Sequence, residues 1–208
     1  MAPMEKFKRM GAEAVIYLEG GYLVKERIKK GYRIDEIDEK IRRFRTSLES
    51  KLLIEAKRNG VYVPSVIDID KQNFKIQMEF VDGVRLKEYL QQSPRNVKKI
   101  CQQLGEIIGR LHNVGIVHGD LTTSNMILKD GNIYLIDFGL GYFSKRIEDY
   151  GTDLKLLKEA FKSTHFKLLK VCWSNILKGY RKEYKNAKEV IEKVGEIEKR
   201  VRYAEKQK

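Results

Sequence analysis

The chain has 208 residues, of which 42% are hydrophobic and 10% aromatic, enough to bury the core of one domain or of two small lobes. No window of about 18 residues is free of charge, and residues 1–10 lack an apolar run, so the sequence predicts neither a membrane span nor a secretory signal and favours a cytoplasmic location. Cys101 and Cys172 have no second cysteine or histidine at ligand spacing. We expect both in the core, without zinc and without a disulfide.

Basic residues outnumber acidic ones by 42 to 29, which gives a formal net charge of +13. Such an excess favours polyanionic partners and phosphate chemistry. Most of it falls in residues 21–58 and 178–208. Two interpretations stay open for these segments: solvated helix faces in a protein rich in Lys and Glu, or a surface that binds nucleic acid.

The first elements in chain order are predicted to be a hairpin and a helix. Strands at 14–20 and 22–28 flank Gly20-Gly21, a pair suited to a hairpin turn that needs positive φ. A helix follows, because apolar side chains recur every three or four residues opposite a charged face, and Asn59-Gly60 is a stop signal. The apolar stripe consists of Ile41, Phe44, Leu48, Leu52 and Ala56.

Two more strands are predicted at 63–69 and 74–80, with a turn at 70–73 between them. The second strand alternates, and its apolar positions are Ile76, Met78 and Phe80. The order strand, strand, helix, strand, strand predicts a small sheet with one main helix.

After residue 82 the sequence becomes mostly helical, and we divide the chain there into a lobe at 1–82 and a lobe at 83–208. An amphipathic helix is predicted at 97–115, then a hairpin around Asp130-Gly131, and helices from Asp153 onward. The last apolar stripe predicts an amphipathic helix that protrudes or packs on a partner, and it consists of Tyr184, Ala187, Ile191, Val194, Ile197 and Val201.

Two motifs carry chemistry. His118-Gly119-Asp120 is followed by Asn125, in the form H-x-D-x-x-x-x-N, and Asp137-Phe138-Gly139 follows an apolar strand. Phosphoryl transfer from ATP needs Mg²⁺ held by hard oxygen ligands and a carboxylate that orients the acceptor hydroxyl. The spacing therefore predicts Asn125 and Asp137 as Mg²⁺ ligands and Asp120 as the base.

The N-terminal half is then expected to supply a lysine and a glutamate. Lys25 lies on the second predicted strand, and a partly buried ammonium needs an anionic partner. Glu49 lies on the flank of the predicted helix, where it could reach Lys25 and hold it over the α and β phosphates. Glu55 on the same helix is a weaker candidate partner.

Together these residues resemble a protein-kinase-like fold and, more narrowly, the small atypical kinase of the KEOPS complex of archaea and eukaryotes. The segments that carry the resemblance are KERIKKGYR (25–33), RFRTSLES (43–50), GVYVP (60–64), HGDLTTSNMIL (118–128), IDFGLG (136–141) and AFKSTH (160–165). The resemblance implies a bilobal α+β fold, with an antiparallel N-lobe sheet and a reduced, mostly helical C-lobe. It also implies an enzyme that uses ATP and Mg²⁺, works as an ATPase beside the transferase subunit that makes threonylcarbamoyl-adenosine on tRNA, contacts other KEOPS subunits, and can phosphorylate Ser or Thr.

Carried over residue by residue, the resemblance assigns Asp120 as proton acceptor, Asn125 and Asp137 as Mg²⁺ ligands, and Lys25 with Glu49 as the phosphate-positioning ion pair. The adenine pocket that it implies consists of Met78, the Glu79 carbonyl, the Val81 amide and Ile127. The place of a kinase glycine-rich loop falls at 11–17 and includes Gly11, Ala12, Glu13, Ala14 and Val15. With one glycine instead of three, this loop is expected to cover phosphates less flexibly.

The chain departs from ordinary protein kinases at two places. Gly119 replaces the arginine that usually senses a phosphorylated activation loop, so that switch is expected to be absent. Only thirteen residues separate Gly139 from Asp153, without an A-P-E motif, so the platform for a peptide substrate is expected to be reduced. We therefore favour ATP hydrolysis coupled to a partner over broad protein phosphorylation. The basic C-terminus lacks the short Arg-Gly-Arg tail expected of the family, which leaves its role with tRNA open.

Two other functions stay open. A small-molecule phosphotransferase of the antibiotic or sugar type shares the HGD and Asn spacing, although LTTSN and an intact DFG argue against it. A non-catalytic RNA-binding scaffold suits the charge, although every catalytic position is present. Among the other side chains, we expect His118 to bond the backbone near Asp137, His112 to lie in a helix cap, His165 to be structural and Trp173 to lie in the core.

Overall fold

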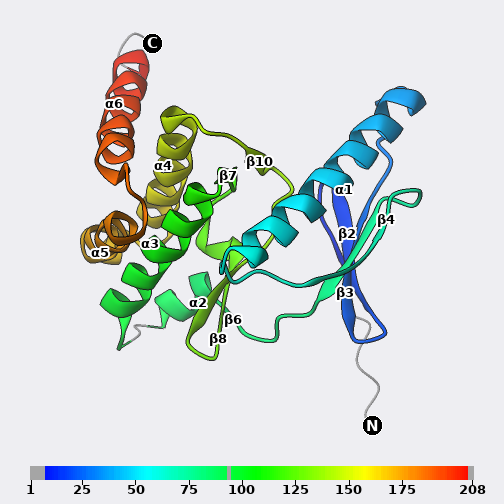
Figure 1. The fold of residues 1–208 in the computed structure, drawn as a ribbon, viewed down its shortest axis with the longest axis horizontal. Helices are drawn as coiled ribbons and strands as arrows, with labels where there is room; N and C mark the ends of the chain where they lie inside the picture. Colours follow the sequence, from blue (N-terminus) through cyan, green and yellow to red (C-terminus); the bar gives the residue numbers. More distant parts are fainter. Residues whose placement is uncertain (1–7, 93–94, 206–208) are drawn as a thin grey trace.

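The computed structural model describes residues 8–92 and 95–205, with side chains as far as residue 200. The N-terminal elements are β1 (Lys8–Met10), β2 (Ala14–Glu19), β3 (Tyr22–Arg27), α1 (Asp35–Arg58), β4 (Val66–Asp70) and β5 (Lys75–Glu79). The later elements are β6 (Val84–Arg85), α2 (Leu86–Gln91), α3 (Val97–Asn113), β7 (Ile116–Val117), a 3₁₀ turn (Thr123–Asn125), β8 (Met126–Lys129), β9 (Asn132–Leu135), β10 (Tyr142–Phe143), α4 (Ile147–Thr164), a 3₁₀ turn (Phe166–Leu168), α5 (Leu169–Glu183) and α6 (Ala187–Glu205). Figure 1 shows the N-terminal sheet and α1 beside the remaining helices.

The N-terminal strands form one antiparallel sheet in the order β1-β2-β3-β5-β4. The predicted hairpin of β2 and β3 is confirmed, and its turn glycines have the positive φ that the turn needs, 58° at Gly20 and 85° at Gly21. The pair of β4 and β5 is also confirmed. β4 begins at Val66 rather than at residue 63, since Pro64 has no backbone N–H to give to a ladder.

Helix α1 begins before the predicted stripe, at a first turn with three acidic residues that suit the positive end of the helix dipole. Leu52, Leu53 and Ala56 in its C-terminal half are buried. Phe44 is 64% exposed, so its predicted place in the core is wrong. The N-terminal half of α1 extends past the sheet (Figure 1), although Asp38 and Thr46 in this half are buried.

The helical part depends on a close approach of α3 and α5. A Cβ at Gly105 of α3 would lie 1.9 Å from the carbonyl oxygen of Ile176, and a Cβ at Gly179 of α5 would lie 1.9 Å from that of Gln102. Only glycine allows two helix backbones to lie this close. Helix α6 packs beside α4 at the outer edge of this part (Figure 1).

The core contains several polar or soft side chains. Cys101 and Cys172 are buried, as predicted, and both are free cysteines. His112 lies in the cap region at the end of α3, as predicted, and its carbonyl oxygen accepts the backbone N–H of the C-cap residue. Its side chain is 1% exposed and contacts the Tyr180 hydroxyl at 2.9 Å and Asp153 at 3.3 Å. A buried histidine of this kind ties α3 to α5 and α4.

Other predicted core positions are only partly right. His165 is buried and lies 3.0 Å from the Thr123 hydroxyl, which confirms a structural role. Trp173 is only partly buried at the edge of the core. Tyr184 precedes α6, whose buried face is formed by Ala187, Val190 and Val194. The Val201 side chain of the predicted stripe lies outside the described residues.

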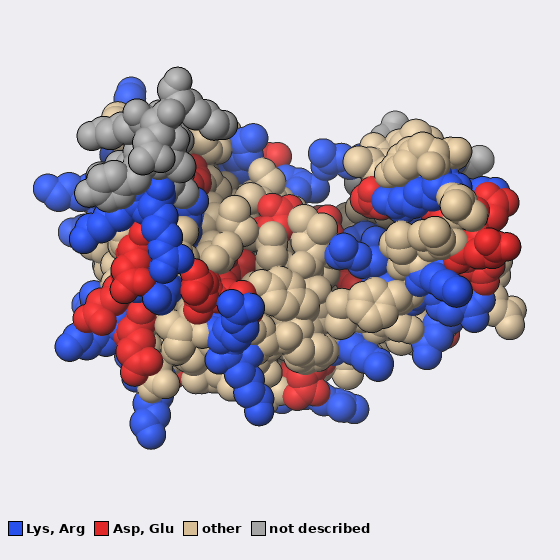
Figure 2. Space-filling view, turned by 90° about the horizontal axis from the view of Figure 1, so that it is seen from above, with Lys and Arg blue, Asp and Glu red and all other residues tan. Residues whose placement is uncertain are grey.

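On the face shown in Figure 2, charged side chains are distributed over the surface rather than clustered in one patch. Figure 2 shows Lys and Arg side chains over both parts of the molecule, with Asp and Glu among them and a hollow between the two parts. Both interpretations of the net charge therefore stay open on this face. In residues 8–92 and 95–205, no helix is long and apolar enough to cross a membrane.

Candidate active site

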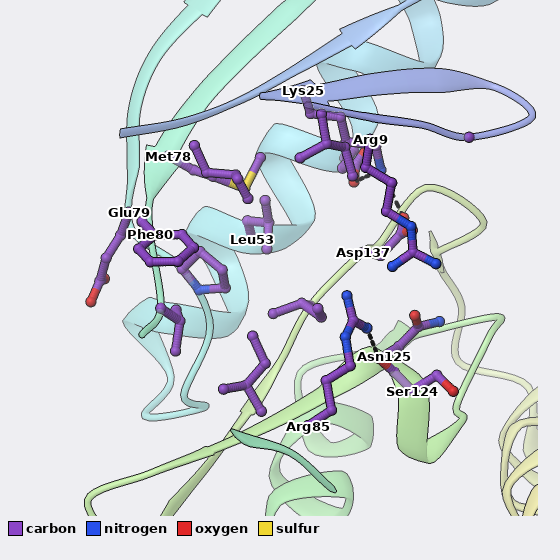
Figure 3. Close-up of a pocket in the computed structure, with 18 residues that line it drawn as sticks. Arg9, Lys25, Leu53, Met78, Glu79, Phe80, Arg85, Ser124, Asn125 and Asp137 are labelled. Carbon is purple, nitrogen blue, oxygen red and sulfur yellow. Dashed lines mark hydrogen bonds and ion pairs between the residues drawn. The ribbon is translucent and has the colours of Figure 1, made fainter. Parts of the chain in front are cut away.

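A cavity of about 330 Å³ lies between the N-terminal sheet, α1 and the β8–β9 hairpin. Figure 3 shows Met78, Leu53 and Phe80 at its apolar end and Lys25 and Asp137 at its polar end. Its volume is in the range of small-molecule sites. An apolar slot that leads to charged groups suits a ligand with a flat ring at one end and an anionic group at the other.

Lys25 projects from β3 into the polar end. Its Nζ donates to Glu49 Oε1 at 2.6 Å and to Asp137 Oδ1 at 2.7 Å. Burial lowers the pKa of Lys25, but the two carboxylates outweigh burial and leave that pKa raised. The ammonium is therefore charged at neutral pH.

Glu49 reaches Lys25 from α1, and its side chain is 2% exposed. Its second carboxylate oxygen accepts a hydrogen bond from Arg27 Nη2 at 2.5 Å, a buried cation that the sequence reasoning missed. Glu55, the alternative partner of Lys25, instead accepts a bond from Asn59 at the end of α1. One carboxylate thus joins α1 to two cations on β3.

Asp137 follows β9 in the left-handed region, with φ 63°, which Asp and Asn tolerate better than most residues. Gly139 N–H donates to its Oδ1 at 3.2 Å. Burial raises the pKa of the Asp137 carboxyl, but Lys25 outweighs burial and lowers it. The carboxylate is therefore ionised, and since it is 46% exposed it can take a further cation.

The loop before β8 brings Asp120 and Asn125 together. Asn125 Nδ2 donates to Asp120 Oδ2 at 2.7 Å and to the Asp120 carbonyl at 3.1 Å. Because a carboxylate only accepts, the amide nitrogen faces Asp120, and the amide oxygen stays available for another partner. Asn125 lines the cavity. Asp120 is not one of the lining residues, but its side chain is bonded to Asn125.

Asp153 of α4 holds this loop, a role that the sequence reasoning missed. Its carboxylate accepts the backbone N–H of His118 at 2.8 Å and that of Gly119 at 3.0 Å. His118 Nε2 lies 3.2 Å from the Ile136 carbonyl oxygen, which confirms the predicted bond to backbone beside Asp137. Burial lowers the pKa of His118, so the neutral imidazole donates this bond.

Gly119 has a steric reason to be glycine. Its φ is 78°, and a Cβ there would lie 2.4 Å from the Leu140 carbonyl oxygen. The segment after Gly139 thus packs directly on the loop, and no side chain fits between them.

The predicted phosphate-covering loop is only partly at the cavity. Gly11 lines it, but the structure does not place four other predicted positions on its wall, which are Ala12, Glu13, Ala14 and Val15. Ile16 lines the cavity instead, because it pairs with Lys25 across the hairpin and both side chains share one face. Because the two-residue turn at Gly20-Gly21 fixes this register, the place of Ile16 opposite Lys25 could have been predicted from the sequence.

The predicted adenine positions all line the cavity: Met78, Glu79, Val81 and Ile127. Two arginines there were not predicted. Arg9 from β1 and Arg85 from β6 approach the polar end from opposite sides (Figure 3), and Arg85 donates to the Ser124 carbonyl. The other unpredicted lining residues are Leu23, Leu53, Pro64, Phe80, Ser124 and Ile136.

The polar end fits a magnesium ion that arrives with a phosphate ligand. Within the described part of the chain, no three His, Cys, Asp or Glu side chains are grouped as a metal cluster. Mg²⁺ commonly keeps several waters and takes only one or two protein oxygens beside substrate phosphates. Asn125 and Asp137 are the residues that would supply two such oxygens, and Mg²⁺ held there would neutralise phosphate charge.

Residues 21–141, more than half of the chain, match the family model of the RIO domain. This chain belongs to the RIO-domain family. The chain is 49% identical to the KEOPS complex subunit Bud32 of Pyrococcus abyssi, over 97% of both chains, and so belongs to the family of that subunit as well.

Other relatives are longer than this chain. It is 47% identical to a probable bifunctional tRNA threonylcarbamoyladenosine biosynthesis protein of Methanococcus maripaludis, and 46% identical to one of Methanosarcina acetivorans, over 93% of its own length in each case. The chain spans 35% of each of these proteins.

Solved structures show the fold. The chain superposes on the Rio2 kinase in its ADP/Mg²⁺–phosphoaspartate complex from Chaetomium thermophilum with a TM-score of 0.61 and 15% identity, covering 97% of this chain and 71% of that one. It superposes on WaaP, solved with acyl carrier protein, with a TM-score of 0.67 and 16% identity, covering 98% and 88%. The fold is therefore protein-kinase-like and α+β, as predicted.

Proposed function

We propose that this RIO domain is a Mg²⁺- and ATP-dependent atypical Ser/Thr kinase or ATPase of the KEOPS complex, which supports threonylcarbamoyladenosine modification of tRNA. The observation that carries the proposal is the contact of Lys25 with both Glu49 and Asp137 in the 330 Å³ cavity. The 49% identity to a KEOPS complex subunit supports the biological setting. A cytoplasmic location suits action on tRNA.

Each cavity residue has a task in this proposal. The adenine ring lies in the apolar slot at Met78 and Ile127 and meets the backbone of Glu79 and Val81. Lys25, held by Glu49, binds the α and β phosphates. Asn125 and Asp137 hold Mg²⁺, and Asp120 accepts the proton of the attacking hydroxyl or water.

A transferase partner is supported by the longer relatives. Their names describe a probable bifunctional protein in tRNA threonylcarbamoyladenosine biosynthesis, and this chain corresponds to 35% of each. A second activity in the same polypeptide is consistent with a separate transferase subunit here. The short segment between Gly139 and α4 leaves little room for a peptide-docking platform, which favours hydrolysis coupled to that partner.

The test is an ATPase assay on the domain alone, then with the transferase subunit, then with tRNA added. We expect turnover to rise at each addition and to fall at least about a hundredfold in Asp137→Ala, because the metal loses a ligand. Asp68→Ala, an exposed aspartate of β4, is the control and should leave turnover unchanged.

Two results would replace the proposal. Unchanged ATP turnover and tRNA modification in Asp137→Ala would favour the RNA-binding scaffold. Rapid phosphorylation of an aminoglycoside or a sugar, unaffected by tRNA or transferase, would favour the small-molecule phosphotransferase.

A further inference from the structure

A second, smaller cavity of about 140 Å³ lies beside the nucleotide-sized one, between α1, the β1–β2 turn and the segment after Asp137. We call it the arginine pocket, and its lining residues are Glu13, Arg27, Ile41, Arg42, Arg45, Gly139 and Leu140. We propose that the arginine pocket binds a phosphate group, either as free phosphate or on a phosphorylated side chain. This site goes beyond the function proposed above and rests on geometry alone.

Arg27 supplies the first argument. It is 7% exposed, and while its Nη2 pairs with Glu49, its Nε is buried without a hydrogen-bond partner in the described part of the chain. A buried N–H without a partner is rare and costly in a folded protein. Because Arg27 lines the pocket, its positive charge lies beside any anion bound there.

Arg45 supplies the second argument. Its Nη1 donates to the Gly139 carbonyl at 2.8 Å, but among the described residues no carboxylate lies within ion-pair distance of it. A guanidinium has five N–H donors, so most of those on Arg45 stay available.

Arg42 is held in a fixed orientation on the same wall. Its Nε pairs with Asp38 at 2.6 Å, and its Cζ lies 4.0 Å from the centre of the Phe74 ring. A side chain fixed on two sides loses little entropy when it binds a ligand. The pocket therefore presents three arginines, of which at least one is already oriented.

Charge and size select the ligand. Glu13 is the only acidic residue on the wall, and Arg33 lies 3.6 Å from its carboxylate. Arginines recognise phosphate through paired, charge-assisted hydrogen bonds. A volume of 140 Å³, compared with about 30 Å³ for each water in the liquid, holds a phosphate group with a few waters but not a nucleotide.

The arginine pocket is separate from the first cavity yet adjoins it. A Cβ at Gly139 would lie 3.3 Å from Lys25 Nζ and 3.6 Å from Arg27 Nη2, so this glycine stands between the two. Glu49 bonds Lys25 with one oxygen and Arg27 with the other. An anion bound to Arg27 would therefore change the electrostatic environment of Lys25.

Calorimetric titration with inorganic phosphate tests the proposal, in the presence of saturating ADP and Mg²⁺ so that the first cavity is filled. We expect a Kd on the order of 1 mM or tighter, and acetate should bind more weakly. Arg45→Gln should weaken phosphate binding at least about tenfold, because a charge-assisted contact is lost. Arg43→Gln is the matched control, since Arg43 is exposed on the same helix and pairs with Glu39, and it should bind phosphate as the wild type does.

Two results would overturn the proposal: no phosphate binding in the presence of saturating ADP and Mg²⁺, or equal affinity in Arg45→Gln and the wild type. If Arg45→Gln does not fold, Arg45→Lys replaces it, and its loss of paired bonds should still weaken binding.

A parallel titration with O-phosphoserine distinguishes a phosphorylated side chain from free phosphate as the ligand. Tighter binding than phosphate identifies a phosphorylated side chain, weaker binding identifies free phosphate, and either supports the site. Titration with ADP alone tests the nucleotide cavity separately, so failure of one site is distinguishable from failure of the other.

Discussion

At the scale of single residues, Glu49 holds two buried cations at once, Lys25 through one oxygen and Arg27 through the other. Removing the charge of Glu49 would leave both cations inside the protein with one carboxylate fewer. The desolvation cost of a buried charge is then no longer offset by its partner. The same carboxylate therefore affects both folding and the position of Lys25.

We expect Glu49→Gln to lower the free energy of unfolding by about 3 to 5 kcal/mol, the usual cost of breaking a buried ion pair. Urea unfolding with an unchanged slope would measure it. Glu55→Gln on the same helix is the control, because Glu55 is 42% exposed, and it should change stability by less than about 0.5 kcal/mol. Equal effects of the two substitutions would contradict the shared ion pair.

Some site residues could be predicted from sequence because a short motif fixes them locally. Asp120, Asn125 and Asp137 stand at motif spacing, and the structure brings them to one end of the cavity or next to it. Asp153 and Arg27 could not be found in this way, because their roles depend on contacts with residues 34 and 22 positions away.

At the scale of elements, the contact of α3 with α5 depends on Gly105 and Gly179, because a side chain at either position would collide with the backbone of the other helix. We expect Gly179→Ala to destabilise the protein by about 3 kcal/mol, because the new Cβ would meet the Gln102 carbonyl oxygen at 1.9 Å and push the helices apart. The shift in thermal or urea midpoint measures this loss.

Gly195→Ala in α6 is the matched control. A Cβ there would meet nothing within 4 Å, so the change should stabilise the helix by about 0.5 to 1 kcal/mol through its better propensity. A loss of stability at both positions would show that the close α3–α5 contact is not the cause.

The elements themselves were predictable where the signal is local. Gly20-Gly21 and Asp130-Gly131 fix their hairpins through turn geometry. Strands β1, β6, β7 and β10 have only two or three residues each, too few for periodicity, and exist through their pairing partners. The start of α1 was missed because its first turns are polar and mostly exposed.

At the scale of the whole molecule, buried histidines link stability to pH. Burial lowers the pKa of His118 and of His165, so the folded state keeps them neutral while the unfolded chain takes up protons below about pH 6.5. Stability should therefore fall as pH drops from about 7 to 5, by at most about 1.4 kcal/mol per pH unit for each histidine. Asp137 acts in a different window, because its lowered pKa gives stability that is lost only below the ordinary aspartate range near pH 3.9.

His165→Gln should flatten this decline, because it removes one such proton uptake while keeping a partner for the Thr123 hydroxyl. Urea midpoints across the pH range would show it. An identical pH slope in the variant and the wild type would contradict the role of His165.

The net charge of +13 predicts a salt-dependent contact with tRNA. If several Lys and Arg side chains neutralise phosphates, the logarithm of the association constant should fall linearly with the logarithm of salt concentration, with a slope of roughly −0.7 to −0.9 per phosphate. Fluorescence anisotropy with labelled tRNA measures it. A flat response would reject the nucleic-acid surface and leave the ATP chemistry unaffected.

The contacts of α1 limit how the proposed kinase or ATPase can be switched. In many kinases the helix that carries this glutamate swings outward to turn the enzyme off. Here an outward movement of Glu49 would leave the buried Arg27 without its carboxylate partner and Lys25 with Asp137 alone, and Arg45 also bonds the Gly139 carbonyl. Such a movement would cost several kcal/mol. We therefore expect α1 to stay in the inward, competent position at all times. Regulation would then depend on the ligand that enters the cavity and on the partner that covers it.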